Sequence, residues 1–360
     1  MQSSHPLIKK LKVIDLSTVL AGPSVGSFFA ELGADVVKIE HPENPDVTRS
    51  WKLPNENKKS PLGAYFSSIN YKKSYRFLNF TKDKERAQLF ELIKTADLVI
   101  MNFKKGAQEK LGISDYELLA KNPNLIIGKI TGFGDQTDRV AYDLILQAES
   151  GMMSINGTDN SGPLKMPIAL IDVLAAHHLK EGLLLALMER EMNPSFEGKT
   201  VTVSLYEAAI SSLVNQASNY LMTGEVPKRM GSLHPNIAPY GELFTTKDGG
   251  LITFAIGSDK HFKLLTQWLK REDLFNDKKF ASAQKRVKNR TFIFEELQQS
   301  VNRFESNEII EGMHELGVPC AKIKSLNEVF NDEIAQNMIR EEVIDGVKTK
   351  RVSGIAFKFG

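Results

Sequence analysis

The sequence predicts an α/β protein with a large domain built on a parallel sheet and a smaller α+β domain. From residue 11 to about 135, short runs rich in β-branched residues alternate with amphipathic stretches, a pattern typical of a parallel sheet with helices on both faces. The chain has 360 residues, enough for two hydrophobic cores. Glycine and proline cluster at 224–241, where regular periodicity disappears, as expected of a linker between two domains.

The large domain is expected to span residues 1–223. Its predicted strands are LKVIDLS, ADVVKIE, YRFLNF, ADLVIMNF and NLIIGKITGF. Helical spacing occurs between them in SVGSFFAEL, KERAQLFELIKT and ISDYELLAKN. The stretch at 172–191 is so rich in leucine and alanine that it predicts a central buried helix. Another strand and a long helix follow in KTVTVSLYEAAISSLVNQASNYLMTG.

The small α+β domain is expected over residues 242–324, after the linker at 224–241. GELFTTKDGGLITFAI predicts a hairpin, and DKHFKLLTQWLKR, RTFIFEELQQSVNRF and NEIIEGMHEL predict helices. The segment 325–360 predicts one helix and a second hairpin that return to the large domain. Cys320 is the only cysteine, so it has no partner for an internal disulfide, and we expect it to be a packing residue.

Composition excludes several classes of partner. The 46 basic and 44 acidic residues nearly balance, which gives no support to nucleic acid or an anionic membrane as an obligatory partner. The start, MQSSHPLIKKLKVIDLS, lacks the apolar run of a signal peptide, and no other run is long and apolar enough to span a bilayer. We therefore expect a cytoplasmic protein. Its histidines and cysteine show no zinc-ligand spacing, so no metal is expected.

One acidic residue, Asp172, lies in PIALIDVLAAHH, where the pattern predicts a strand followed by a helix. A structural interpretation is that Asp172 is the N-cap of this helix, because aspartate is a preferred N-cap residue. A functional interpretation is equally open, since ligands of open α/β sheets bind at the carboxyl ends of strands, beside helix N-termini. An aspartate at this junction could serve both purposes.

The first strand and helix do not carry a nucleotide-binding motif. Gly22 and Gly26 form only GxxxG, and no Walker-type GK[ST] occurs, which disfavours a dehydrogenase or a kinase. Small residues at Ala21-Gly22 would let the backbone approach a ligand, and Pro23 suits a first helical turn. A purely structural turn would have the same sequence.

Eight blocks occur in the order found in family III CoA-transferases of the CaiB/BaiF type: VLAGP, LGADVVKIEHPENPDVTR, NYKKS, ADLVIMNFKKGAQEKLGI, NPNLIIGKITGFG, AYDLILQAESGMMSINGT, GPLKMPIALIDVLAA and HPNIAPY. The chain resembles this family from roughly residue 8 to 335, which is far more specific than one glycine motif. The resemblance implies a Rossmann-like large domain, a small domain and a homodimer of two interlocked chains. It also implies an enzyme that moves coenzyme A from an acyl-CoA to a carboxylic acid.

The resemblance implies a role for particular residues. Asp172 matches the family's nucleophile, which forms a mixed anhydride and then an aspartyl-CoA thioester; a carboxylate ionised near neutral pH needs no histidine base for this. Coenzyme A is expected to be bound by Val19, Leu20, Ala21, His41, Lys73, Asn102, Phe103, Lys104, Lys110 and Leu111. Tyr142 and Asp143 are expected to orient the acyl group, although Asp143 could equally cap the helix that begins DLILQAESG.

The lysines of NYKKS and NFKKGAQEK could meet the coenzyme's phosphates or lie on a solvated surface. They are Lys72, Lys73, Lys104, Lys105 and Lys110. Two positions depart from the family pattern, because His41 and Lys110 stand where related transferases often have arginine. Replacing a fork-shaped donor in this way predicts weaker phosphate binding or the use of other residues. For the family's glycine-rich loop, IGSDKHF around Gly257 is only a thin match.

Two alternative functions stay open. The family includes α-methylacyl-CoA racemases, whose catalytic histidine precedes an aspartate; this chain has Tyr142 before Asp143, and tyrosine is a poor base for that reaction. A non-catalytic acyl-CoA-binding protein is the other alternative, prompted by the two lost arginines, although Asp172 argues against it. His177 and His178 lie on the predicted buried helix, where we expect packed residues rather than catalysts.

Overall fold

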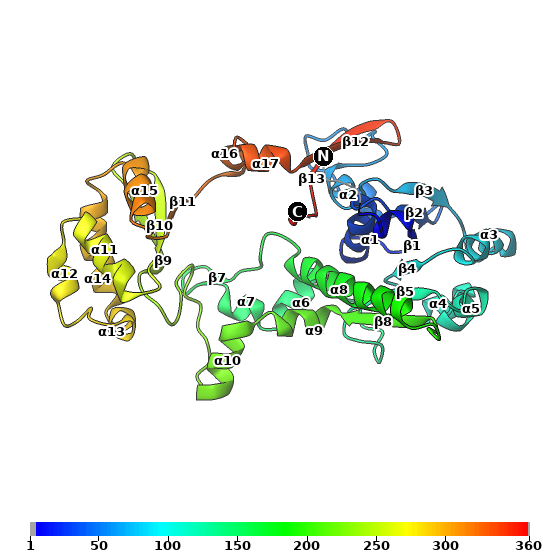
Figure 1. Cartoon of the computed structure of the whole chain (residues 1–360), viewed down its shortest axis with the longest axis horizontal. Helices are drawn as coiled ribbons and strands as arrows, with labels where there is room; N and C mark the ends of the chain where they lie inside the picture. Colours follow the sequence, from blue (N-terminus) through cyan, green and yellow to red (C-terminus); the bar gives the residue numbers. More distant parts are fainter. Residues whose placement is uncertain (1–4, 359–360) are drawn as a thin grey trace. The chain divides into compact units, whose positions relative to one another are not determined.

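The computed structural model describes residues 5–358 and divides them into two compact units (Figure 1). Unit 1 contains the described residues up to Met153, Lys165–Val226 and the described residues from Asn337 onward. Unit 2 contains Ser154–Leu164 and Pro227–Gln336. Each unit has its own hydrophobic core.

A parallel six-stranded sheet forms the centre of unit 1. Its strands are β1 (Lys12–Asp15), β2 (Asp35–Glu40), β3 (Ser74–Phe77), β4 (Leu98–Met101), β5 (Ile126–Thr131) and β8 (Lys199–Ser204). They lie in the order β3-β2-β1-β4-β5-β8, with all neighbours parallel. The chain winds outward in one direction from β1 to β3 and in the other from β4 to β8, so the switch point lies between β1 and β4. This architecture confirms the predicted α/β fold.

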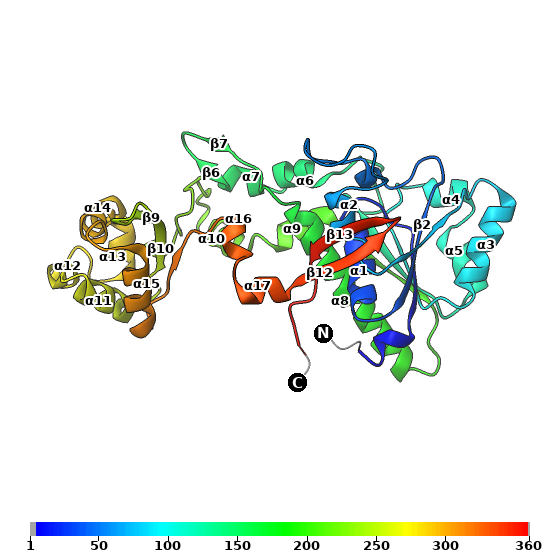
Figure 2. The same cartoon turned by 90° about the horizontal axis from the view of Figure 1, so that it is seen from above.

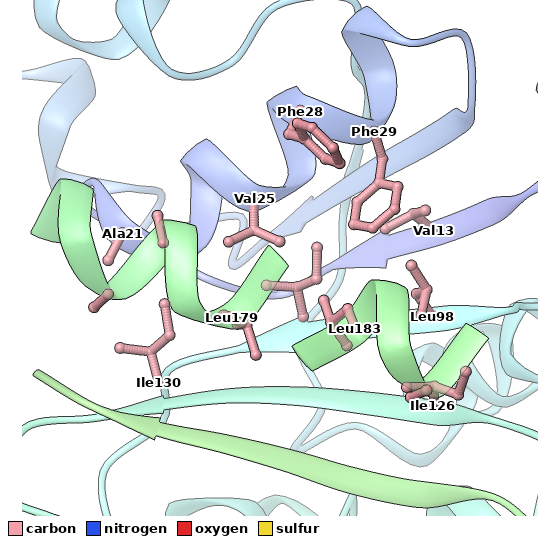
Figure 3. Close-up of a cluster of buried hydrophobic side chains, with 14 of the residues drawn as sticks. Val13, Ala21, Val25, Phe28, Phe29, Leu98, Ile126, Ile130, Leu179 and Leu183 are labelled. Atoms are coloured by element: carbon pink, nitrogen blue, oxygen red, sulfur yellow. The ribbon is translucent and has the colours of Figure 1, made fainter. Parts of the chain in front are cut away.

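Helices cover both faces of this sheet because successive strand residues point to opposite sides. On one face, α1 (Ala21–Glu31), α8 (Leu170–Met192) and α9 (Leu205–Ser211) pack over Val13 and Ile126. Figure 3 shows Val25, Phe29, Leu179 and Leu183 filling this layer. On the other face, α3 (Asp83–Ile93) and α5 (Asp115–Lys121) pack over Ile14 and Ile127. The apolar runs of the central strands therefore contribute to two cores at once.

The leucine-rich helix is confirmed as α8, but the expectation that little of it faces water was wrong for this chain. Leu185 is 66% exposed and Met188 is 58% exposed, and His177 and His178 also lie on the exposed side. These residues recur at helical spacing, so one side of α8 packs on the sheet while the other is exposed among residues 5–358. The two histidines are accordingly not packed residues.

The C-terminal hairpin, β12 (Ile339–Ile344) and β13 (Val347–Val352), packs against α2 (Ala64–Ser68) in unit 1 (Figure 2). Ion pairs hold it, from Arg351 to Glu31 at 3.1 Å and from Arg49 to Asp345 at 2.8 Å. The single helix predicted before the hairpin is two short ones, α16 (Leu326–Val329) and α17 (Glu333–Asn337). The break occurs where the Asp332 carboxylate accepts a hydrogen bond from the Ile334 N–H and favours a turn.

The remaining helices of unit 1 are short, apart from α10, and most of them lie in the connections between strands. They are η1 (Ile8–Lys10), η2 (Val47–Arg49), α4 (Ala107–Leu111), α6 (Asp143–Glu149) and α10 (Val214–Thr223); α7 (Met152–Ile155) crosses into unit 2. Within residues 5–358, no helix combines the length and the apolar character needed to cross a membrane.

Unit 2 is built on a three-stranded antiparallel sheet of β9 (Tyr240–Thr245), β10 (Leu251–Ala255) and β11 (Cys320–Lys322). The predicted hairpin is β9–β10. Helices beside the sheet are α11 (Asp259–Trp268), α12 (Glu272–Asn276), α13 (Ala283–Lys288), α14 (Arg290–Val301) and α15 (Ser306–Glu315). A two-stranded ribbon, β6 (Gly157–Thr158) and β7 (Gly162–Pro163), completes the unit. Cys320 is buried in the core of this unit, as a packing residue would be.

Candidate functional site

A cleft of about 460 Å³ lies in unit 1 at the carboxyl ends of β1, β4 and β5. Its walls include Thr18–Ala21 after β1, Met101–Gly106 after β4 and Lys129–Gly132 at the end of β5. Segment 139–142 and Asp172 complete the side near α8. This is the switch point of the sheet, where open α/β folds bind their ligands.

Asp172 lines the cleft from the first turn of α8, and the N-cap interpretation was wrong. The helix begins at Leu170 after the capping position Ala169, which makes no side-chain cap hydrogen bond, so Asp172 is the third helical residue. No strand leads directly into the helix, because residues 164–169 form an irregular connection. The side chain is only 9% exposed. Within residues 5–358 its carboxylate has no ion-pair partner.

Asp143, the first residue of α6, supplies the cap that α8 lacks. Its Oδ1 accepts a hydrogen bond from the Ile171 N–H at 2.7 Å, and its Oδ2 accepts one from the Gln147 side chain. Gln147 in turn accepts the Met166 N–H at 2.7 Å. The two side chains, one helical turn apart on α6, thus fix the chain that leads into α8 at two points. They hold Asp172 at the cleft wall without bonding to its carboxylate.

Burial, reinforced by the negative charge of Asp143, raises the pKa of Asp172 to about 7. A carboxyl group with this pKa is a mixture of acid and carboxylate near neutral pH. The phenol of Tyr65 is in the same electrostatic environment as Asp172. Burial, together with the charges of Asp172, Asp143 and Asp46, raises the pKa of Tyr65 to about 12. Tyr65 lies on α2 and packs edge-on against Trp51, with ring centroids 5.1 Å apart. Sequence reasoning missed Tyr65 because nothing in the sequence around it indicated proximity to Asp172.

The turn after β1 is fixed by side chains from three other places in unit 1. Asn102 holds Thr18 at two points, accepting its N–H at 3.0 Å and donating to its carbonyl oxygen at 2.8 Å. The Lys38 ammonium donates to the Ser17 carbonyl oxygen at 2.6 Å. Asp46 accepts the Val19 N–H. Every backbone step from Ser17 to Val19 therefore has its own polar partner, and this wall of the cleft is preorganised.

The structure brings most of the expected coenzyme-binding residues together. Those that line the cleft are Val19, Leu20, Ala21, Asn102, Phe103 and Lys104, and Tyr142 lies with them. Gly22 and Gly26 have a structural role. A Cβ at Gly22 would collide with Ser17, and one at Gly26 would lie 2.8 Å from Asp15 Oδ2. The GxxxG spacing thus serves close packing of α1 on the end of β1.

Four expected residues lie outside the cleft lining. Lys73 is buried, and its ammonium group contacts Asp15 at 2.8 Å, Asn70 at 2.9 Å and two backbone carbonyl oxygens, so it serves as a structural cation here. His41 accepts the N–H groups of Glu43 and Asn44 on Nδ1, as a turn-stabilising residue. Lys110 is exposed on α4, and Leu111 packs against the hydrophobic core.

Three further cations line the cleft. Lys105, which the sequence marked only as a phosphate candidate, donates to the Gln136 carbonyl oxygen at 3.2 Å. Lys129 pairs with Asp115 at 2.7 Å. Arg139 pairs with Glu149 and lies 4.1 Å from the centroid of the Phe133 ring. Sequence reasoning did not single out Lys129 or Arg139, because Lys129 lies within strand β5 and Arg139 lies in an irregular segment. Among residues 5–358, no group of three histidine, cysteine or acidic side chains could hold a metal ion.

The raised pKa of Asp172 predicts that this residue lowers stability at alkaline pH. The folded protein retains a proton on Asp172 that the unfolded chain has lost, so stability falls as pH rises from the ordinary aspartate value towards about 7. Asp172→Asn should therefore raise the free energy of unfolding at pH 8 by roughly 1–2 kcal/mol, and by less at pH 5. Urea unfolding at both pH values measures this, with the exposed Glu181→Gln on the same helix as control. A gain that is equal at both pH values would contradict the raised pKa.

Comparison with known proteins agrees with this geometry. The family model of CoA-transferase family III matches residues 8–360. The chain is 33% identical over 342 residues to the succinate–glutarate CoA-transferase of Agrobacterium fabrum, covering 93% of this chain and 84% of that protein. It is 32% identical over 329 residues to the succinyl-CoA:mesaconate CoA-transferase of Haloarcula marismortui, covering 89% and 81%.

Solved structures agree as well. The crystal structure of a CaiB/BaiF family protein from Brucella suis matches with a TM-score of 0.82 and 32% identity, covering 99% of this chain and 93% of that one. Rv3272 from Mycobacterium tuberculosis matches with a TM-score of 0.83 and 26% identity, covering 100% of this chain and 95% of that one. With the parallel sheet, the switch-point cleft and the family match over nearly the whole length, the chain belongs to CoA-transferase family III.

Proposed function

We propose that this family III enzyme transfers coenzyme A from an acyl-CoA to a carboxylic acid through covalent intermediates on Asp172. The observation that carries the proposal is the placement of Asp172: it lines the switch-point cleft, it is nearly buried, and it has no ion-pair partner within residues 5–358. A carboxylate without an ion-pair partner is a better nucleophile than one whose charge is neutralised by a cation. Preorganised position supplies the effective concentration that a weak nucleophile needs.

The first half of the reaction transfers the acyl group and then the coenzyme. A carboxylate oxygen of Asp172 attacks the thioester carbonyl carbon, the C–S bond breaks, and coenzyme A leaves as a thiolate. The product is a mixed anhydride between Asp172 and the acyl group. The thiolate then attacks the aspartyl carbonyl carbon, and the donor acid leaves as its carboxylate, so that an aspartyl-CoA thioester remains. A thiolate leaves readily, which makes each exchange between activated acyl groups feasible.

The second half reverses these steps with the acceptor. The acceptor carboxylate attacks the aspartyl thioester, releases the thiolate and forms a second anhydride. Attack of the thiolate on the acceptor's acyl carbon gives the new acyl-CoA and regenerates Asp172 as a carboxylate. Asp143 has an indirect part in this scheme: it caps α8 through the Ile171 N–H, and its charge favours the protonated form of Asp172 at rest.

Coenzyme A is proposed to lie along the preorganised wall of the cleft. Thr18–Ala21 and Asn102 offer backbone and packing contacts, and small residues there allow a close approach. Lys104 and Lys105, exposed at the rim, are suited to the coenzyme's phosphates. These lysines would bind the phosphates in place of the arginines that related transferases often have at the positions of His41 and Lys110.

Short dicarboxylic acids are the proposed substrates. The relatives of this chain are named for succinate and glutarate, for succinyl-CoA and mesaconate, and, in Acetobacter aceti, for acetyl-CoA and oxalate. Lys129 and Arg139 line the cleft, and a cation of this kind suits a second carboxylate.

The racemase alternative has weaker support. Proton exchange next to a thioester needs a base near neutral pH, and the position that carries histidine in racemases is Tyr142, which is 52% exposed. His177 and His178, the nearest histidines in sequence to Asp172, do not line the cleft. A non-catalytic acyl-CoA-binding protein would have no use for a buried carboxylate that lowers its stability.

Asp172→Asn is expected to abolish transfer, by at least about a thousandfold in kcat, because an amide cannot form the anhydride. Coenzyme A binding should survive, as the preorganised wall is untouched. Exchange of labelled coenzyme A into an acyl-CoA pool measures transfer, and calorimetry measures binding. In the wild type, kcat/KM should rise with pH through about 7, as Asp172 of the free enzyme ionises.

Glu181→Gln is the matched control for this experiment, because it makes the same carboxylate-to-amide change at an exposed site of α8. It should exchange label like the wild type. Substantial turnover by Asp172→Asn would contradict the proposal.

A homodimer is also proposed. The exposed side of α8 carries Leu185 and Met188, and on α10 Leu221 is 78% and Met222 is 86% exposed. Apolar surface of this extent marks an interaction face. Light scattering should give twice the chain mass down to high dilution, and Leu185→Glu should shift the population towards monomer. A wild-type chain that stays folded as a monomer would contradict this.

A further inference from the structure

Val19 adopts a backbone conformation that its side chain disfavours. Its φ of +72° lies in the left-handed region, which β-branched residues rarely enter. Val19 also lines the cleft, between Thr18 and Leu20. A strained residue persists only where its surroundings hold it, and such residues gather at functional sites.

Asp46 holds this conformation. The Val19 N–H lies 3.3 Å from both carboxylate oxygens of Asp46, and within residues 5–358 it has no other acceptor. The same carboxylate accepts the Thr48 N–H at 3.0 Å and the Thr48 hydroxyl at 2.7 Å, and it pairs with the Lys38 ammonium at 3.1 Å. Asp46 is 1% exposed, so its carboxylate is surrounded by these donors and shielded from water.

Asp46 is itself fixed from behind. Its N–H donates to Glu40 at 2.8 Å. Arg49 donates two hydrogen bonds to the same Glu40 carboxylate, from Nε at 2.9 Å and from Nη2 at 2.7 Å. Arg49 also pairs with Asp345 of the C-terminal hairpin and stacks 4.0 Å from the centroid of Phe66. The position of Asp46 is therefore set by a rigid buried network, and this rigidity reaches Val19.

We propose that Asp46 is a positioning residue for coenzyme A binding, which acts by holding Val19 in the left-handed conformation that shapes the cleft wall. This inference rests on the proposed function, because it takes the coenzyme to occupy this cleft. Asp46 does not line the cleft, so it acts through Val19 and its neighbours. When the hold is lost, Val19 relaxes to negative φ and displaces the backbone of Thr18–Ala21.

Asp46→Asn tests this directly. Because the Val19 N–H lies equally close to both carboxylate oxygens, the NH₂ group of the amide faces this N–H in either orientation, together with Thr48 on the Oδ1 side or with Lys38 on the Oδ2 side. The KM for acyl-CoA should rise about tenfold or more, with kcat within about twofold of the wild type, since strain of this kind amounts to roughly a factor of ten in an equilibrium. A purely structural role would instead reduce the amount of active enzyme, lowering apparent kcat while KM stays unchanged.

Val19→Gly supplies the rescue. Glycine adopts positive φ without steric cost, so the cleft wall should keep its shape when Asp46 no longer holds it. The rise in KM caused by Asp46→Asn should therefore be at least about threefold smaller in the Val19→Gly background than in the wild type. Equal rises in the two backgrounds would overturn the inference.

Val19→Pro covers the case in which Asp46→Asn does not fold. Proline fixes φ near −65° and leaves the contacts of Asp46 with Lys38 and Thr48 in place. It should raise KM at least as much as Asp46→Asn, and a wild-type KM in a folded Val19→Pro enzyme would overturn the inference.

Asp345→Asn is the control at the far end of the network. Arg49 keeps its two bonds to Glu40 in this variant, so KM should stay at the wild-type value. A rise in KM equal to that of Asp46→Asn would overturn a specific role for Asp46. Absence of exchange in the unsubstituted enzyme would overturn the proposed function together with this inference, whereas exchange with an unchanged KM in Asp46→Asn overturns the inference alone.

Discussion

Two buried lysine–aspartate pairs at the carboxyl ends of β1 and β2 hold the part of the molecule on which the site depends. Lys73 pairs with Asp15 at 2.8 Å and Lys38 with Asp46 at 3.1 Å, and all four side chains are shielded from water. Burial alone would raise the pKa of Asp15, but Lys73 and Lys38 together hold it below its ordinary value. Removing one member would leave a buried charge unpaired, so the four act as a unit. Around them, the turn after β1 has little freedom to move.

The electrostatic environment of Asp172 is the opposite of that of Asp15, because it raises the pKa rather than lowering it. Its neighbours give it burial and a second negative charge but no cation, whereas Asp15 and Asp46, on the other side of the fold's switch point, are fully neutralised. The contrast separates carboxylates that maintain the fold from the one that we propose takes part in the reaction. Asp143 joins the two purposes, since one carboxylate oxygen caps α8 while its charge shifts the pKa of Asp172.

The sequence was sufficient to predict the sheet and the existence of α8, because alternating apolar runs and helical spacing follow from backbone geometry. It could not predict which lysine of NYKKS points inward: Lys72 is exposed and Lys73 is buried, and only tertiary contacts decide this. The sequence also could not predict how α8 is capped, because the residue that accepts the Ile171 N–H, Asp143, lies 28 residues earlier in the chain. The leucines on the open side of α8 follow the same pattern as those on the sheet side, so composition alone predicted burial for both.

We propose that acyl and coenzyme A groups pass through a covalent bond to Asp172. The most direct measurement is to add hydroxylamine to the enzyme with an acyl-CoA and to map the modified peptide by mass spectrometry. Hydroxylamine attacks an aspartyl anhydride or thioester, so we expect a hydroxamate on Asp172 within PIALIDVLAAHH, and none when acyl-CoA is omitted. An unmodified Asp172 in an enzyme that turns over, or a hydroxamate on a different carboxylate, would contradict it.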